Sequence, residues 1–87
     1  MAKKIRTVWH IYILETLTGQ LYTGMTKDLV RRMKEHQKGK SCRFTRTFGF
    51  KKLLYTEDFP TRSKAMQREC QIKTFPRQKK LKLITAK

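Results

Sequence analysis

Acidic residues are scarce in this chain of 87 residues: 6 Asp and Glu stand against 22 Lys and Arg, which gives a formal net charge of +16. Such an excess of one sign disfavours the compact state through self-repulsion, and it is typical of proteins whose partner is a polyanion. The charge therefore predicts a partner such as nucleic acid or an anionic membrane surface.

Long apolar runs are also lacking. The apolar stretch after the basic N-terminus is interrupted by His10, Glu15 and Thr16, so it is too short for a signal peptide or a membrane span. Binding to a membrane surface requires a basic amphipathic helix, whereas the cations here are spread over several segments. Nucleic acid is therefore the expected partner, and no contact with a membrane is expected.

Cysteine is too rare for a disulfide framework. The chain has two cysteines, Cys42 and Cys70, and they do not form a C-x-x-C pair. They indicate reduced thiols in a reducing compartment, so we expect a cytoplasmic protein.

The apolar residues that are present predict a folded chain. They make up 38% of the sequence and include one Trp, three Tyr and five Phe, which is too rich in aromatics for a disordered basic tail. A chain of this length builds one hydrophobic core, so residues 1–87 are expected to form a single domain. No helix shows a long apolar seam, which favours a monomer.

Residue patterns predict two strands, a helix and then a third strand. Val8–Leu14 is β-branched and aromatic, with Tyr12 among the residues on one face, and the turn at 16–19 joins it to a strand over 20–26. Gly24 in that strand indicates a bulge or a close approach to the backbone. Asp28 is expected to cap a helix that ends at Gly39, and residues 52–58 are expected to form a buried strand.

The C-terminal part predicts two more helices. One starts at 60–63 and carries the apolar residues Ala65, Met66, Cys70 and Ile72. A short final helix over 77–84 is expected to turn Leu81 and Ile84 inward. The order is ββ-α-β-α-α, which defines a small α+β domain with a three-stranded antiparallel sheet flanked by helices.

A basic segment without a single acidic residue runs over 38–52 and is expected to be a long loop, with at most a short helical turn. Its cations alternate with Phe44, Phe48 and Phe50, whose rings either stack on unpaired bases or belong to the core. The cations expected to bind nucleic acid here and in the helices are Lys27, Arg31, Lys40, Arg43, Arg46, Lys51 and Lys73.

Polar residues also occupy positions where apolar ones are expected. Arg32 and His36 share one helix face, Glu69 lies on the face of Ala65 and Ile72, and Tyr12 and Tyr22 can meet across the hairpin. Burying these groups without a use is unfavourable. Ordinary pairings remain the alternative, Arg32 with Asp28 and Glu69 with Lys73.

Together these side chains supply what phosphodiester hydrolysis requires. A divalent cation held by carboxylate and water oxygens stabilises charge on the phosphate. A guanidinium matches two phosphate oxygens, and a general base takes the proton of the attacking water.

Two short motifs, His10-Ile11-Tyr12 and Tyr22-Thr23-Gly24, lie on the two predicted strands, with their tyrosines ten residues apart. They resemble the paired signature of the GIY-YIG nuclease superfamily, although His10 and Thr23 depart from its glycine and isoleucine. Residues 25–36 and 65–73 resemble the two helices that bear the family's arginine and glutamate. The resemblance spans 9–84 and is nearest to the small single-domain YhbQ-like bacterial group, which is related to the nuclease domain of eukaryotic Slx1.

The resemblance implies a catalytic set of Tyr12, Tyr22, Arg32, His36 and Glu69. It makes Tyr22 the general base beside Tyr12, Arg32 the contact to the scissile phosphate, and Glu69 the sole protein ligand of one Mg²⁺ or Mn²⁺ ion. An unperturbed phenol, with a pKa of about 10, is a weak base at neutral pH, so Tyr22 needs a nearby positive charge. The residues alone do not rank the two tyrosines.

The implied function is a metal-dependent endonuclease that hydrolyses DNA, with a preference for branched, flapped or otherwise distorted DNA. RNA remains open as a substrate. The alternatives are a non-catalytic basic DNA- or RNA-binding module and a nuclease subunit that is active only with an accessory protein.

Overall fold

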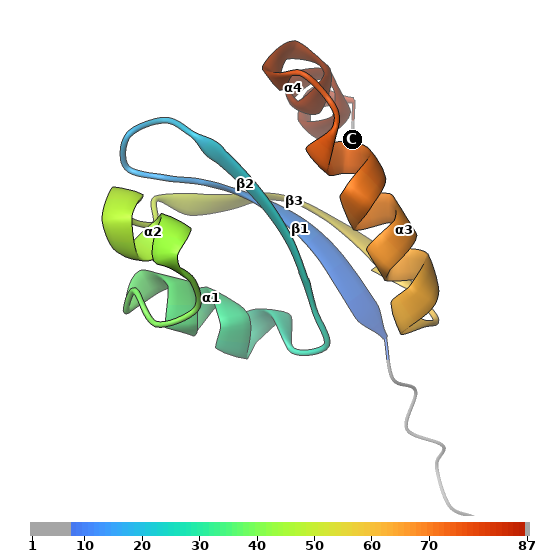
Figure 1. Ribbon diagram of the computed structural model, residues 1–87, viewed down its shortest axis with the longest axis horizontal. Helices are drawn as coiled ribbons and strands as arrows, with labels where there is room; N and C mark the ends of the chain where they lie inside the picture. Colours follow the sequence, from blue (N-terminus) through green and yellow to red (C-terminus); the bar gives the residue numbers. More distant parts are fainter. Residues whose placement is uncertain (1–7, 87) are drawn as a thin grey trace, which may run out of the picture.

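A single three-stranded sheet organises the chain in the computed structural model, which describes residues 8–86 (Figure 1). The strands are β1 (Trp9–Glu15), β2 (Leu21–Thr26) and β3 (Lys52–Phe59), in the order β2-β1-β3, and both pairings are antiparallel. The expected hairpin and third strand are therefore confirmed. The basic N-terminus at 1–7 lies outside the described residues.

Two helices lie on each side of this sheet (Figure 1). Helices α1 (Leu29–Gln37) and α2 (Arg43–Phe48) lie on one side, and α3 (Arg62–Lys73) and α4 (Arg77–Thr85) lie on the other. The sheet with its flanking helices is the α+β fold that the sequence predicts. Helix α2 is the short helical turn within the basic segment at 38–52.

Side-chain caps set the beginnings of α1 and α3. The Asp28 carboxylate accepts a hydrogen bond from the Arg31 backbone N–H at 3.1 Å, and the Thr61 hydroxyl accepts one from the Lys64 N–H at 3.2 Å. Gly39, at φ +69°, follows the end of α1 in the left-handed conformation that glycine adopts without strain.

The two faces of the hairpin carry different chemistry. Tyr12 is paired with Gly24, and Leu14 with Tyr22, so both tyrosines lie on the face that α1 and α2 cover. A Cβ atom at Gly24 would come within 2.5 Å of the Tyr12 hydroxyl oxygen. Glycine therefore stands here because the phenol crosses directly over the backbone, the close approach that the sequence predicts.

The opposite face holds the apolar core. Ile11 and Ile13 of β1 pack with Tyr55 of β3 and with Ala65 and Ile72 of α3. Trp9, Leu21, Met25, Phe59, Phe75, Leu83 and Ile84 pack partly buried around this group.

Leu81, which the sequence predicts to face inward, is exposed, and so are Met66 and Cys70 of α3. Leu81 and Met66 are 38% and 37% exposed. In α4, Leu83 packs against the core with Ile84 where the sequence predicts Leu81. The prediction for Leu81 is wrong because α4 is rotated so that the adjacent residues 83 and 84 face the core.

An ion pair spans α3 and β3 beside this core. The Glu57 carboxylate accepts hydrogen bonds from Nε and Nη2 of Arg68, both at 3.0 Å, and another from the Tyr55 hydroxyl. This hydrogen bonding raises the pKa of Arg68, and burial is the main cause that raises the pKa of Tyr55 to about 12.

Among residues 8–86, no helix is long and apolar enough to cross a membrane.

Candidate active site

A buried hydrogen-bond chain lies under α1 and α2. The Tyr12 hydroxyl is 2.8 Å from Nε2 of His36, and Nδ1 of His36 is 2.8 Å from the Thr45 hydroxyl. Each of these three residues is only 1% exposed. Strand β1, helix α1 and helix α2 are thus joined by one polar network.

Burial fixes the protonation of this network. It is the main cause that lowers the pKa of His36 to about 4, with a further lowering from the Arg32 guanidinium. Burial likewise raises the pKa of Tyr12 well above its ordinary value. We therefore assign a neutral His36 whose Nε2 accepts a hydrogen bond from the Tyr12 hydroxyl and whose Nδ1–H donates one to the Thr45 hydroxyl.

Tyr22 lies beside this pair and is only half-buried. Its ring centroid is 6.3 Å from that of Tyr12 and 5.6 Å from that of His36. Burial, a hydrogen bond with Cys42 and the negative charge of Glu69 raise its pKa to about 12, while Arg32 lowers it. Of the two tyrosines, Tyr22 is the one that a substrate can reach.

Cys42 links Tyr22 to the buried chain. Its sulfur is 3.5 Å from the Thr45 hydroxyl. Burial alone would raise the pKa of this thiol, but hydrogen bonds with Thr45, with Tyr22 and with the backbone bring it below its ordinary value. Thr45 and Cys42 are therefore parts of the site that the sequence pattern did not single out.

The phenylalanines of the basic segment pack against the rings of Tyr22 and His36. The Phe44 ring stacks on Tyr22 at 5.3 Å, and the Phe50 ring stacks on His36 at 6.4 Å. Phe48 packs against Phe44 at 5.0 Å. All three are half-buried, so their packing role is the one the structure supports.

Arg32 lies at the edge of the site, and its partner is Glu35. Its Nε is 3.2 Å from Glu35, and Nε of Arg31 is 3.3 Å from the same carboxylate. Asp28, the partner considered from sequence, instead caps α1. Glu35 therefore holds two guanidiniums together at the surface of α1.

Glu69 approaches from the other helical layer. It is on α3, its side chain is 17% exposed, and it pairs with Lys73 at 3.4 Å. This is the alternative pairing considered from sequence. Helix α3 packs against β2, the strand that carries Tyr22, and the negative charge of Glu69 contributes to the raised pKa of that phenol.

A metal at Glu69 would have few protein ligands. Within the described part of the chain, no group of three or more His, Cys, Asp or Glu side chains is placed to hold a metal ion. This excludes for those residues the closed cage typical of structural zinc. One carboxylate with water and phosphate oxygens is a donor set that Mg²⁺ accepts.

The cations predicted to bind nucleic acid are all exposed. They lie mainly on α1, α2 and the loops beside them, with Lys73 on α3: Lys27, Arg31, Lys40, Arg43, Arg46, Lys51 and Lys73. Helices α1 and α2 cover the sheet face on which Tyr12 and Tyr22 lie.

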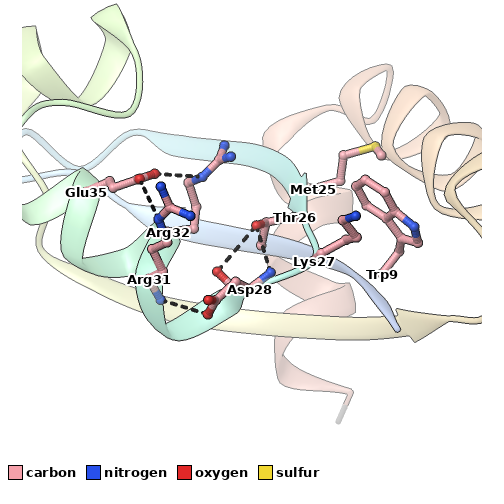
Figure 2. A pocket seen from close by; sticks show the side chains of 8 residues that line it. All are labelled: Trp9, Met25, Thr26, Lys27, Asp28, Arg31, Arg32 and Glu35. Atoms are coloured by element: carbon pink, nitrogen blue, oxygen red, sulfur yellow. Dashed lines mark hydrogen bonds and ion pairs between the residues drawn. The ribbon is translucent and has the colours of Figure 1, made fainter. Parts of the chain in front are cut away.

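A pocket of about 330 Å³ adjoins Arg32 (Figure 2). Trp9 and Met25 lie at one end, Arg31, Arg32 and Glu35 lie at the other, and the strand end from Thr26 to Asp28 lies between them. The sequence pattern gave Trp9 no role beyond a hydrophobic one.

The fold is a small α+β domain in which a phenol, a guanidinium and a carboxylate lie on neighbouring elements, an arrangement compatible with the nuclease class. The family model that matches is the GIY-YIG catalytic domain, over residues 8–82. Because the match covers most of the sequence, the chain belongs to the GIY-YIG family, a family of nucleases that generally depend on a divalent metal.

Similar proteins come from the small bacterial UPF0213 group. A UPF0213 protein of Staphylococcus saprophyticus is 46% identical over 76 residues, which cover 87% of this chain and 93% of that protein. One from Staphylococcus aureus is 42% identical over 74 residues, with coverages of 85% and 90%. The solution NMR structure of a UPF0213 protein from Bacillus halodurans aligns with a TM-score of 0.60 at 41% identity, covering 92% of this chain and 85% of that one.

Proposed function

We propose that this protein is a metal-dependent endonuclease that hydrolyses DNA phosphodiester bonds, with a preference for branched, flapped or distorted DNA. The observation that carries the proposal is the placement of Tyr22, Arg32 and Glu69. Each retains contact with solvent, Arg32 shares α1 with His36, whose ring is 5.6 Å from that of Tyr22, and α3 with Glu69 packs against β2. Exposed cations lie on α1, α2 and the adjoining loops, and they supply the positive charge that binding to a phosphate backbone requires.

Burial divides the roles of the two tyrosines in this proposal. Tyr12 and His36 are each 1% exposed, so neither meets a substrate directly, and they position the site. Tyr22, which is half-buried, takes the proton of the attacking water. The Tyr12–His36–Thr45 chain keeps α1 and α2 in place over the sheet, so that Arg32 and Tyr22 stay near each other.

Arg32 and Glu69 supply the charges. The Arg32 guanidinium binds a non-bridging oxygen of the scissile phosphate, and Glu35 holds its Nε side. Glu69 would hold one Mg²⁺ or Mn²⁺ ion, which stabilises negative charge on the phosphate and the leaving oxygen. Lys73, which pairs with Glu69, is 52% exposed and is free to turn to a neighbouring phosphate.

Tyr22 requires this positive environment. A phenol with a pKa of about 12 is deprotonated in only about one molecule in 10⁵ at pH 7. Arg32 already lowers that pKa, and a divalent cation beside Glu69 would lower it further. We therefore expect cleavage to accelerate as the pH rises from 7 to 9.

The test compares labelled flap, fork, nicked and plain duplex DNA in Mg²⁺, Mn²⁺ or EDTA. We expect cuts that require metal, that are more frequent on the flap and fork, and that Glu69→Gln slows by about 10²-fold or more. Binding of DNA by Glu69→Gln should stay within a few-fold of wild type. Glu15→Gln, which removes a carboxylate at the end of β1, serves as the matched control and should cut normally.

Equal cleavage by wild type and Glu69→Gln would contradict the assigned metal ligand. Tight binding without cuts in any metal would favour a binding module or a subunit that needs an accessory protein. The different roles of the two tyrosines are tested separately. Tyr22→Phe should lower the cleavage rate by about 10²–10⁴-fold, the range of a general base. Tyr12→Phe should lower the rate much less, because it removes one positioning hydrogen bond.

A further inference from the structure

The pocket beside Arg32 has an aromatic end and a cationic end (Figure 2). Its volume of about 330 Å³ is near the lower end of the range of roughly 300–1,000 Å³ that is typical of small-molecule sites. Trp9 is half-buried and packs against the core, so the indole is held in place by the fold. The aromatic end is therefore a fixed surface and not a mobile side chain.

The Trp9 ring is already associated with cations. The Lys27 ammonium is 5.4 Å from its centroid, and the Arg62 guanidinium is 5.9 Å from it. Lys27 lines the pocket with Trp9 and is exposed. A cation–π contact at an exposed site is weaker than the stacking of a nucleobase on an aromatic ring. A base can therefore displace Lys27 from the indole, which frees the ammonium to pair with a phosphate.

The cationic end is organised by Glu35. The carboxylate engages Nε of both Arg31 and Arg32, and the Arg31 side chain is 77% exposed. The pocket thus has two guanidiniums, one lysine and two carboxylates, and keeps an excess of one positive charge. Arg32 lines this pocket and lies one helical turn before His36, whose ring centroid is 5.6 Å from that of Tyr22. A ligand in the pocket therefore lies next to Arg32, the residue to which we assign the scissile phosphate.

We propose that this pocket binds one unpaired nucleotide next to the scissile phosphate, with its base on Trp9 and its phosphate at Arg31 and Lys27. The position of the cut relative to this nucleotide rests on the proposed function, whereas the binding itself does not. The pocket thereby defines the substrate class as a nucleic acid with at least one unpaired nucleotide at the site of cleavage.

The selectivity follows from the state of the base. A base inside a continuous duplex is stacked and paired, and must be extruded before its face can meet Trp9. A base in a flap or at a fork has already lost its partner, so it enters the pocket without that penalty. Exposed lysines and arginines alone do not make this distinction, because they contact phosphates that every duplex presents.

Trp9 is the only tryptophan of the chain, so its fluorescence reports on the pocket directly. The wild-type protein is titrated in EDTA with DNA that carries a one-nucleotide flap and with the same DNA carrying an abasic flap. The base is removed from the DNA, and Trp9 is left unchanged, because Trp9 also packs against the core and its substitution would disturb folding. A nicked duplex without a flap is the third ligand, and gels confirm that each DNA stays intact during the titration.

We expect the flap with a base to quench Trp9 fluorescence strongly and to bind about tenfold more tightly than the abasic flap, as the loss of one stacked base predicts. The abasic flap and the nicked duplex should leave the fluorescence nearly unchanged. A flap made of RNA, tested in parallel, shows whether the pocket prefers deoxyribose or ribose. Equal quenching and equal affinity for the base-bearing and abasic flaps would overturn the proposal.

This outcome is separate from that of the cleavage assay. Base-dependent quenching without any metal-dependent cut would retain the pocket and reject the nuclease. Metal-dependent cutting with no base-dependent quenching would retain the nuclease and reject the pocket. Arg31→Ala provides a second measurement, and it should weaken flap binding severalfold, whereas Lys64→Ala, an exposed cation on α3, should weaken it less.

Discussion

The buried, neutral His36 predicts a specific sensitivity of the fold to acid. Its pKa is about 4 in the folded protein against 6.5 when it is unperturbed. Between these two values the unfolded chain binds a proton that the folded chain does not, so the free energy of unfolding decreases as the pH falls. The contribution of His36 is complete above pH 6.5 and is lost progressively between pH 6.5 and 4.

The expected magnitude is substantial. The difference between a pKa of 6.5 and one of about 4 corresponds to about 3 kcal/mol, at 1.36 kcal/mol for each pH unit. Small domains have a free energy of unfolding of about 5–15 kcal/mol in total. Protonation of this one ring therefore removes a large part of the stability of the chain.

The assay is urea unfolding of wild type and His36→Gln from pH 4 to 7. The variant loses hydrogen bonds to Tyr12 and Thr45, which lowers its stability at every pH. The difference between the two proteins should shrink by up to about 3 kcal/mol as the pH falls, while the titration of all other groups cancels. A difference that stays constant over this range would refute the assignment of a neutral, buried His36.

Three further predictions concern packing, ion pairs and salt. Gly24→Ala should cost about 1–3 kcal/mol in urea unfolding, because its Cβ would lie 2.5 Å from the Tyr12 hydroxyl; an unchanged midpoint would contradict this packing. Glu57→Gln should lose about 2 kcal/mol in the same assay, since Glu57 and Arg68 are only 20% and 25% exposed, whereas Glu35→Gln should lose less than about 0.5 kcal/mol. DNA affinity should fall about 100-fold between 50 and 200 mM salt if about four phosphates are neutralised, and a flat dependence would contradict the polyanion interface.

The sequence predicted the parts of the site whose placement depends on local geometry. The alternation of a strand is enough to place Tyr12 and Tyr22 on one face of the hairpin, and their ring centroids are indeed 6.3 Å apart. Asp28 followed by a periodic segment was enough to place the start of α1, and hence Arg32 and His36. These features need no knowledge of the tertiary fold.

Contacts between distant segments were not predictable in this way. Thr45 contacts His36 only because α2 packs back against α1. The spacing of apolar residues in the sequence does not predict how these two helices pack. The partner of Arg32 is a further case: positions three and four residues away are both within reach on a helix, and the capping role of Asp28 leaves Glu35 as the partner. Leu81 was misassigned because three apolar residues in a four-residue span fit more than one rotation of a short helix.

The sheet order has a consequence for how the protein is made. The central strand β1 is the first element of the described chain, and it pairs with β2 at once but with β3 only after α1 and α2 have been synthesised. At about 5–20 residues per second, Glu69 is added to the chain about 3–11 seconds after Tyr12. Both tyrosines, Arg32 and His36 are thus present in the nascent chain before the carboxylate that we assign to the metal. A ribosome-bound chain therefore presents a basic surface to nucleic acid before it holds a complete hydrolytic site.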